Sequence, residues 1–401
     1  MKRSIFFRLV ATLFAFSLVA AACGGDDEGD GDGDGGPAAK DCTWVIGTIG
    51  ALSGDFASIG QPIFNGIEFA INEINEQGDL ACELELQSED SQGNPEQAPQ
   101  LAQSLTENEE LAGIVGPYFS GETLATGDIY DQAGIAFLCP SCTNETIDDQ
   151  GWGTFFRAVA DDEVQGEQAG VYIAEALGAE TTAIVHDNQD YSKGLAERVA
   201  EQLGDAATQP IIISPEETDY SSAVAEVKDS GADVVFYGGY VPQAGPLAKQ
   251  LKEGGVDAQF VSDDGTKDNQ FGELAGSAAE GAQVTCPCAD PGEVEGGAEF
   301  VSGMEEEYGE PPGTFAAEAY DSVYLFAEAL KDFDGDSAIE EVRQGIVDFL
   351  DSVEGFEGVV KAYSFNDQGN VEVGPEGIYV YEWDTKEGDF VILGAVDELV
   401  S

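Results

Sequence analysis

The cysteines are the residues of this chain whose spacing most directly suggests chemistry. Cys139 and Cys142 form the sequence Cys-Pro-Ser-Cys, and Cys286 and Cys288 form Cys-Pro-Cys. Two cysteines separated by two residues are typical of thiol–disulfide oxidoreductases, so a redox role for Cys139 and Cys142 is one hypothesis. We favour a local structural disulfide in each pair, and we expect no zinc site because the spacing of the two pairs does not match a zinc knuckle.

Two further cysteines, Cys42 and Cys82, each stand where a strand is predicted to begin. A disulfide between neighbouring strands is therefore plausible for this pair. With Cys23 set aside for another role, six cysteines remain, and an even number is typical of an exported chain. Several pairings of the six are compatible with the sequence.

Motifs for catalysis are incomplete throughout the chain. His186 is the only histidine, so Ser-His-Asp, Cys-His and HExxH sites lack their parts. A GxGxxG match at 31–36 lies in an acidic run with no preceding strand, where phosphate would be repelled. The run from Asp332 resembles the start of an EF-hand loop but has Ser337 where glycine is needed. We expect no enzyme activity, no cofactor and no metal.

The N-terminus has the features of an exported lipoprotein. Residues 5–21 are mostly apolar and follow a basic start, and the run is too short for a transmembrane helix, so 1–22 is predicted to be a signal peptide. Cys23 follows Ala-Ala-Ala and resembles the cysteine of a bacterial lipobox, which becomes acylated. Secretion without a lipid is the alternative. Residues 23–40 are rich in Gly, Asp and Glu, cannot bury apolar surface, and are predicted to form a tether.

The charge of the chain restricts its partners. The sequence has 79 acidic and 15 basic residues and a formal net charge of −64. Such a field repels nucleic acid and anionic lipid headgroups, so we expect no nucleic-acid partner. A neutral or zwitterionic ligand is not repelled by this field. We interpret the acidity as adaptation to saline surroundings.

From residue 44 onward, short apolar runs alternate with amphipathic segments, which predicts an α/β protein with two doubly wound parallel-sheet lobes in tandem. Pro62 and Pro95 are predicted to open the first two helices. The predicted strands are 44–50, 84–87, one ending at 114–115, 135–138, 155–159, 182–185, 211–213, 233–237, 259–261, 362–365, 378–383 and 390–393. The predicted helices are 62–77, 95–105, one ending at 129–132, 164–177, 192–203, 220–229, 243–252, 300–308 and 315–333.

Five stretches of the sequence carry a specific resemblance. They are IGTIGALSGDFASIG at 46–60, GIEFAINEIN at 66–75, GPYFSGETLATGDIY at 116–130, IVHDNQDYSKGLA at 184–196 and DVVFYGGY at 233–240. In this order and spacing they resemble the leucine/isoleucine/valine-binding proteins, the branched-chain amino-acid receptors of bacterial ABC importers, which have the type I periplasmic-binding-protein fold.

The resemblance implies two lobes joined by a three-strand hinge, with the ligand enclosed when the lobes close. Lobe 1 is then expected at 41–161 and 288–372, and lobe 2 at 162–287 and 373–401.

The resemblance also implies how a zwitterionic ligand would be held. Ser120, before a helix at the carboxyl end of the sheet, matches the serine that binds the ligand carboxylate. Ser141 matches a position that contributes backbone groups, and Thr143 matches one that contributes a hydroxyl. Asp264 matches the acidic position, commonly Glu, that receives the ammonium group. A disulfide between the cysteines that flank Ser141 would stiffen this loop.

Aromatic and aliphatic residues are implied to enclose the rest of the ligand. The residues expected to close over it or to form its side-chain pocket are Tyr191, Tyr240, Phe315, Ile59, Tyr118 and Phe119. The family often has an aromatic residue where Ile59 stands and small residues near Tyr118 and Phe119. The side-chain pocket is therefore reshaped, and valine, leucine, phenylalanine or a small amide remain candidate ligands.

The function expected from the sequence is an extracytoplasmic substrate-binding receptor. It would be a monomer anchored to the bacterial membrane by its lipid, would capture a neutral amino acid, and would deliver it to an ABC permease. A receptor for urea or a short amide is the alternative within the same fold. From other classes, we considered an exported thiol–disulfide protein using Cys139 and Cys142, and a sensor ectodomain.

Overall fold

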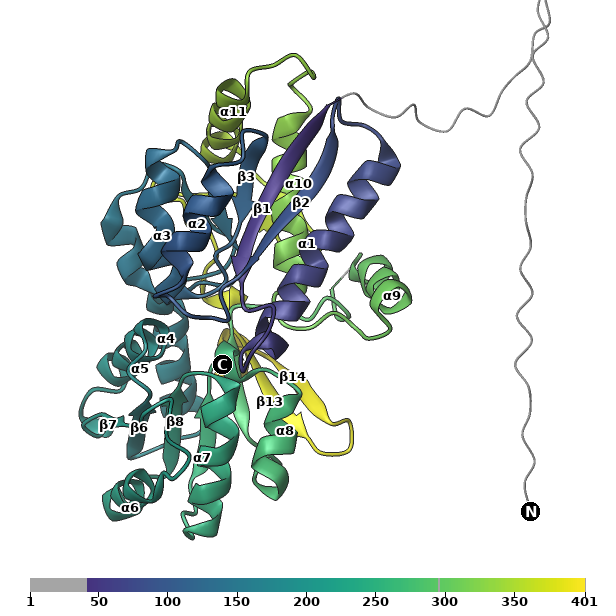
Figure 1. Ribbon diagram of the computed structural model, residues 1–401. Coiled ribbons are helices and arrows are strands. Elements are labelled where there is room, and N and C mark those ends of the chain that lie inside the picture. The colour runs from purple at the N-terminus through teal and green to yellow at the C-terminus, as the bar shows by residue number, and fades with distance from the viewer. Residues whose placement is uncertain (1–41, 295, 401) are drawn as a thin grey trace, which may run out of the picture. The chain divides into compact units, whose positions relative to one another are not determined.

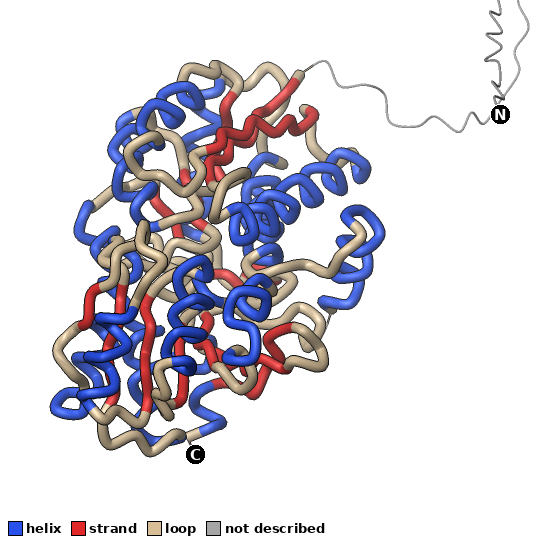
Figure 2. The backbone as a smooth tube through the Cα atoms, turned by 60° about the horizontal axis from the view of Figure 1, so that its bottom comes forward, coloured by secondary structure: helices blue, strands red, loops and turns tan. Residues whose placement is uncertain are grey.

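The computed structural model describes residues 42–294 and 296–400 (Figure 1). The predictions for the signal peptide 1–22, for Cys23 and for the tether 23–40 lie outside the described residues. The described chain forms two large β-sheets and one two-stranded sheet, and Figure 2 shows the strands of both large sheets lying between helices. We call the elements around the first sheet lobe 1 and those around the second sheet lobe 2.

The sheet of lobe 1 has five parallel strands in the order β2-β1-β3-β4-β5. They are β1 Thr43–Gly50, β2 Glu83–Asp90, β3 Leu111–Val115, β4 Phe137–Cys139 and β5 Phe155–Arg157. Its helices are α1 Ala57–Gln77, α2 Ala98–Thr106, α3 Ser120–Gln132, α9 Gly297–Tyr308, α10 Ala316–Leu330 and α11 Ile339–Ser352. A small hairpin of β11 Phe356–Glu357 and β12 Ala362–Tyr363 completes this lobe.

Both faces of the lobe 1 sheet are covered. Successive side chains of a strand point to opposite faces, so Trp44 and Ile46 of β1 pack with α1 and α10, whereas Val45 and Ile49 pack with α2 and α3. Helices α1 and α10 lie side by side (Figure 1) although more than 200 residues separate them. Burial on both sides explains why β1 and β3 read as continuous apolar runs.

The sheet of lobe 2 has seven strands in the order β14-β13-β10-β9-β8-β6-β7. They are β6 Thr182–His186, β7 Ile211–Ile212, β8 Val234–Gly238, β9 Gln259–Ser262, β10 Gln283–Cys286, β13 Tyr379–Asp384 and β14 Asp389–Ala395. Its helices are α4 Asp162–Val171, continued by a short π-helix at Tyr172–Ala176, then α5 Asp190–Leu203, α6 Ser221–Ser230, α7 Val241–Glu253, α8 Gln270–Ala275 and α12 Val396–Leu399. The last two strands, β13 and β14, run antiparallel, because a connection of four residues cannot join parallel strands.

The chain passes between the lobes three times: after β5, after β10 and between β12 and β13. The first and third passages lie side by side, since Val371 N donates to Arg157 O at 3.0 Å. The buried Arg157 side chain also donates to Asn370 Oδ1 at 2.9 Å and to Asn144 O at 3.0 Å. The predicted two-lobe α/β fold with a three-strand hinge is confirmed, and the exact lobe bounds 41–161 with 288–372 and 162–287 with 373–401 stay a prediction.

Two predicted helix starts were wrong. Helix α1 begins at Ala57, five residues before Pro62, because Gly60 lets the first turn approach the loop after β1, where a Cβ would lie 2.0 Å from Ala51 O. Helix α2 begins at Ala98, with Pro99 in its first turn, and not at Pro95. The helices α8 and α11 and the strand β10 were not predicted.

Three disulfides join the six cysteines of the described region. The Cα atoms are 4.9 Å apart for Cys42 and Cys82, 5.9 Å for Cys139 and Cys142, and 5.1 Å for Cys286 and Cys288. The first links the starts of β1 and β2, as expected for neighbouring strands. The other two are local, as the sequence analysis favoured.

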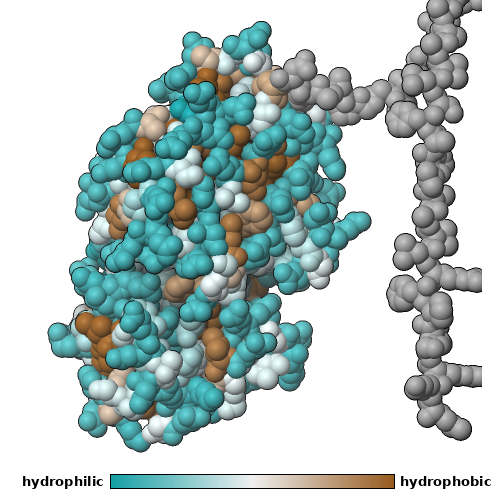
Figure 3. Space-filling model, in the orientation of Figure 1, coloured by the Kyte–Doolittle hydropathy of each residue, from teal (hydrophilic) through white to brown (hydrophobic). Residues whose placement is uncertain are grey.

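The surface agrees with the composition. The face in Figure 3 is mainly hydrophilic, and its apolar residues lie in separate small groups. Within 42–294 and 296–400, no helix is both long enough and apolar enough to span a membrane.

Candidate functional site

The carboxyl group of Asp264 lies where three elements of lobe 2 converge. Asp264 begins a short 3-10 turn directly after β9, at the carboxyl end of the sheet. Its Oδ1 accepts hydrogen bonds from Gln165 Nε2 of α4 at 2.7 Å and from the Tyr191 hydroxyl of α5 at 2.8 Å. Only 6% of Asp264 is exposed. Burial raises the pKa of Asp264 to about 6, while the bonds from Gln165 and Tyr191 act in the opposite direction.

Other acceptors around Asp264 have no hydrogen bond within the described part of the chain. They are both carboxylate oxygens of Asp162, Oδ1 of Asp263 and Oε1 of Gln165. Asp162 and Asp263 are fully buried, and burial raises the pKa of each well above its usual value. The nearby Thr143 hydroxyl of lobe 1 partly offsets this rise in the pKa of Asp162. That hydroxyl makes no hydrogen bond of ordinary geometry within the described residues. Buried acceptors without donors are costly, so this region is complementary to a positively charged donor.

The predicted hydroxyls of lobe 1 connect two loops. Ser120 is the first residue of α3, and its Oγ accepts from the backbone N–H groups of Thr143 at 3.3 Å and of Asn144 at 3.2 Å. The Ser141 hydroxyl donates to Tyr118 O at 2.7 Å. The loops after β3 and β4 therefore meet at one edge of the sheet, next to the start of α4, where Asp162 N donates to Thr143 O at 2.8 Å.

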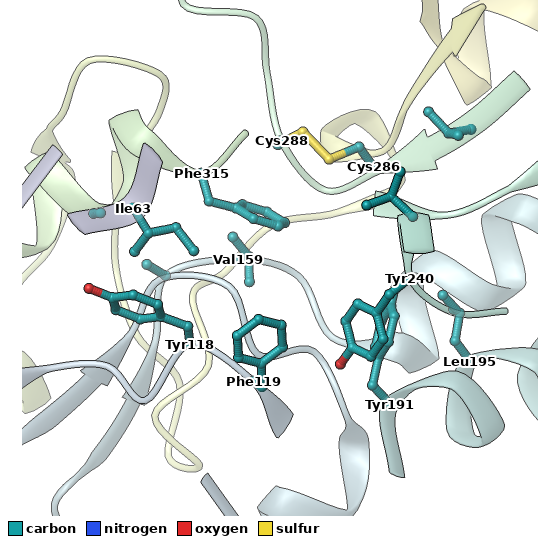
Figure 4. Packing of buried hydrophobic residues seen from close by; sticks show 14 of the residues in the cluster. Ile63, Tyr118, Phe119, Val159, Tyr191, Leu195, Tyr240, Cys286, Cys288 and Phe315 are labelled. Atoms are coloured by element: carbon teal, nitrogen blue, oxygen red, sulfur yellow. A yellow bond between two sulfur atoms is a disulfide. The ribbon is translucent and has the colours of Figure 1, made fainter. Parts of the chain in front are cut away.

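Four aromatic rings meet between the lobes. Phe56 and Phe119 of lobe 1 lie 5.3 Å and 5.5 Å, centroid to centroid, from Tyr240, which precedes α7 in lobe 2. Tyr191 lies 5.1 Å from Tyr240. These rings line a cavity of about 130 Å³ that Glu122 also borders. In Figure 4, Phe119 and Phe315 face Tyr191 and Tyr240 across the space between the lobes.

A second cavity, of about 450 Å³, brings together Ile59, Asp264 and Phe315. Phe315 directly precedes α10 with a φ of +64°, a left-handed conformation that is strained for a bulky residue. Strained residues persist where the surrounding structure holds them, and they cluster at functional sites. The half-buried Ile59 and the strained Phe315 thus border the same space as the carboxyl group of Asp264.

Nine of the ten predicted binding residues fall into three groups. Phe119, Tyr191 and Tyr240 line the smaller cavity, and Ile59, Asp264 and Phe315 line the larger one. Ser120, Ser141 and Thr143 form the loop junction behind them. Tyr118 differs from its predicted place, because its ring packs on Gly50 inside lobe 1 and its hydroxyl accepts from Thr48 Oγ1 at 2.9 Å.

Sequence analysis missed three residues of the site. Phe56 lies within the stretch 46–60 that carried the resemblance, in the segment 54–61 that was expected to be a loop. Asp162 and Gln165 stand three residues apart at the start of α4, so they share one helix face. Two polar residues on one helix face, next to the first passage of the chain between the lobes, were the signal in the sequence that could have identified them.

Direct contacts hold the lobes together on both sides of these residues. Asn144 Nδ2 donates to Asp190 O at 2.7 Å, and Glu145 pairs with Arg198. On the other side, the Thr314 hydroxyl donates to Lys267 O at 2.7 Å. The structure therefore represents a conformation in which the two lobes enclose the site.

Comparison with known sequences decides the family. The profile of the periplasmic binding protein family matches residues 43–389, which includes nearly all of the described chain. The chain belongs to the periplasmic binding protein family. The predicted family and fold class are thereby confirmed.

Individual relatives of this periplasmic binding protein are similar over most of their length. It is 31% identical over 348 residues to an amino acid binding protein of Pseudomonas aeruginosa, with 85% of this chain and 90% of the relative covered. It is 28% identical over 342 residues to the leucine-, isoleucine-, valine-, threonine-, and alanine-binding protein of the same bacterium, with 84% and 89% covered. The structure of the branched-chain amino acid transporter substrate binding protein LivJ of Streptococcus pneumoniae, in complex with isoleucine, has a TM-score of 0.78 at 26% identity and covers 87% of this chain and 99% of its own.

Proposed function

We propose that this protein is the extracytoplasmic receptor of an ABC importer and that it binds a neutral amino acid of the branched-chain type between its lobes. The observation that carries the proposal is the buried Asp264 carboxyl group, oriented by Gln165 and Tyr191 and surrounded by acceptors that have no donor among the described residues. An α-ammonium group supplies three donors and a positive charge, which is what this region needs. The names of the similar amino-acid receptors support the same class of ligand.

Each group of site residues has a role in this proposal. Asp264 receives the ammonium group. Ser120 and Thr143, with the backbone N–H groups near the start of α3, hold the carboxylate without an arginine. Tyr191 and Tyr240 close over the ligand from lobe 2. Ile59, Phe119 and Phe315 contact the apolar part of the ligand.

The cellular setting belongs to the same proposal. Lipidation at Cys23 would hold the receptor at the outer side of the cell membrane, and residues 23–40 would act as the tether. The closed receptor would be a monomer that delivers its ligand to a permease. Catalysis would take no part, and ATP hydrolysis would be carried out by the partner.

A receptor for urea or a short amide is the second candidate. It rests on the reshaped side-chain pocket around Ile59. A neutral amide has no ammonium group, so it would leave the carboxyl group of Asp264 without a cationic partner. We therefore favour the amino acid.

Calorimetric titration of the full chain in high salt, against the twenty amino acids, urea and acetamide, tests the proposal. We expect one-to-one binding of an amino acid and its loss in Asp264→Asn. Asp257→Asn, at an exposed position of the same lobe, is the matched control. Binding of urea or acetamide alone, or amino-acid binding that Asp264→Asn leaves unchanged, would overturn the assignment.

A further inference from the structure

Lys267 is a cation beside the proposed ammonium site that makes no ion pair in the described chain. It follows Asp264 in the same turn, where Lys267 N donates to Asp264 O at 3.0 Å. Its Nζ lies 4.4 Å from the centroid of the Tyr381 ring and 3.5 Å from Thr314 Oγ1, which is a weak contact. Burial lowers the pKa of Lys267. In a chain with 79 acidic and 15 basic residues, a lysine held in this way without a carboxylate partner requires an explanation.

The Lys267 side chain borders the cavity of about 450 Å³, where its ammonium group can reach a ligand. Asp264, Lys267, Ile59 and Phe315 all border this cavity. Ser58, from the first turn of α1, borders it too, and its hydroxyl oxygen is buried without a partner within the described residues. A purely aliphatic ligand side chain would leave both the Lys267 ammonium group and the Ser58 hydroxyl unused.

The charged groups around this cavity determine which polar group of a ligand it favours. Asp290, Glu318 and Asp389 all act on Lys267, and all three border the same cavity. A ligand carboxylate near Lys267 would also lie near the carboxyl groups of these three residues, and the repulsion between carboxylates disfavours it. A neutral carbonyl oxygen can accept a hydrogen bond from the ammonium group without this repulsion. A carboxamide also offers an N–H donor for the Ser58 hydroxyl oxygen.

We propose that Lys267 is a specificity-determining residue that accepts, in the larger cavity, the neutral carboxamide end of an amino-acid side chain, as in glutamine. The proposal rests on the proposed function, because the α-ammonium group must sit at Asp264 for the side chain to enter this cavity. The carbonyl oxygen of the carboxamide accepts from Lys267 Nζ, and its N–H group donates to Ser58 Oγ. Ile59 and Phe315 contact the methylene groups.

The test is calorimetric titration of the full chain with glutamine, glutamate and leucine, in the wild type and in Lys267→Met. A hydrogen bond from a charged donor is worth about 1.5–3 kcal/mol, so we expect glutamine affinity to fall roughly 10- to 100-fold in Lys267→Met while leucine affinity stays within about 2-fold. The backbone contact from Thr314 to Lys267 O is kept in this variant. Lys249→Met removes the same charge from an exposed position and is the control.

A second variant tests the same proposal without changing Lys267. Ser58→Ala should weaken glutamine binding about 3- to 10-fold and leave leucine binding unchanged, because it removes one neutral hydrogen bond. Leucine binding without glutamine binding in the wild type would overturn this proposal but not the proposed function. Equal losses for both ligands in Lys267→Met, or tighter binding of glutamate than of glutamine, would also overturn it. Binding of none of the twenty amino acids would contradict the proposed function itself.

Discussion

The Tyr191 hydroxyl donates a 2.8 Å hydrogen bond to Asp264 Oδ1 and accepts one of 3.2 Å from Gly265 N. One side chain of α5 thus fixes both the carboxyl group and the backbone of the turn after β9. The Tyr191 ring also lies tilted against the Tyr240 ring, with centroids 5.1 Å apart, so the orientation of Asp264 depends on the aromatic rings between the lobes. The ligand-binding predictions below follow from this coupling.

Tyr191→Phe should weaken amino-acid binding roughly 10- to 100-fold. It removes a hydrogen bond to a charged group, worth about 1.5–3 kcal/mol, but keeps the ring. Titration calorimetry with the best-bound amino acid measures the loss. Tyr324→Phe, on α10 where the hydroxyl accepts from Gln77, is the control and should bind normally. Equal affinities in wild type and Tyr191→Phe would exclude the role of this hydroxyl.

Ligand affinity should depend on pH through Asp264. Burial raises the pKa of Asp264 to about 6, and only the ionised form attracts an ammonium group. Affinity should therefore be highest above this pH and should fall by up to about tenfold per pH unit below it. Titrations between about pH 5 and 8 measure this slope. Asp264→Asn should bind weakly at every pH, and a flat profile in the wild type would contradict the prediction.

Phe56→Ala should favour the open conformation. The Phe56 ring contacts Phe119 within lobe 1 and Tyr240 across the space between the lobes, and such aromatic pairs contribute about 0.5–1.5 kcal/mol. Ligand affinity should fall about 2- to 10-fold, mainly through faster dissociation. Stopped-flow measurement of the dissociation rate tests this. An unchanged rate would show that Phe56 does not stabilise closure.

Stability should fall with rising pH through Glu122. Ser91 Oγ donates to Glu122 Oε1, and burial raises the Glu122 pKa from 4.5 to about 8. The folded state therefore keeps a proton that the unfolded state releases, and the stabilising contribution is lost as pH rises from about 4.5 through about 8.

Glu122→Gln should remove this pH dependence, which changes the free energy of unfolding by up to about 1.4 kcal/mol per pH unit. The variant should match the wild type near pH 5 and should be the more stable protein above about pH 8. Urea unfolding across this range is the measurement. Glu109→Gln, at an exposed position, should leave the slope unchanged. Parallel curves for Glu122→Gln and wild type would show that Glu122 ionises normally.

The disulfide between Cys42 and Cys82 should contribute most to stability among the three. It spans a sequence separation of 40, and a loop of this length predicts a loss of about 4 kcal/mol when both cysteines become serine. The pair Cys286 and Cys288 has a separation of only 2, so its removal should cost much less. Denaturant unfolding of the two double variants compares them. The reverse order would contradict the prediction.

The sequence by itself determined the order of most strands and helices and the places of many site residues. Apolar periodicity is local, so it predicted the strands that become β1, β6 and β8. Ser120 and Asp264 could be placed after strands because doubly wound folds bind ligands at the carboxyl ends of their sheets. The start of α1 was missed, because it depends on how closely Gly60 approaches Ala51.

Only the tertiary structure decided which distant residues meet. The partners Gln165 and Asp264 are 99 residues apart, and Lys267 and Thr314 are 47 apart. Tyr118 and Phe119 are adjacent in the chain, yet the first turns into lobe 1 and the second faces lobe 2. These outcomes depend on the packing of whole faces of sheets and helices against one another. Such long-range complementarity is not encoded in any local pattern of the chain.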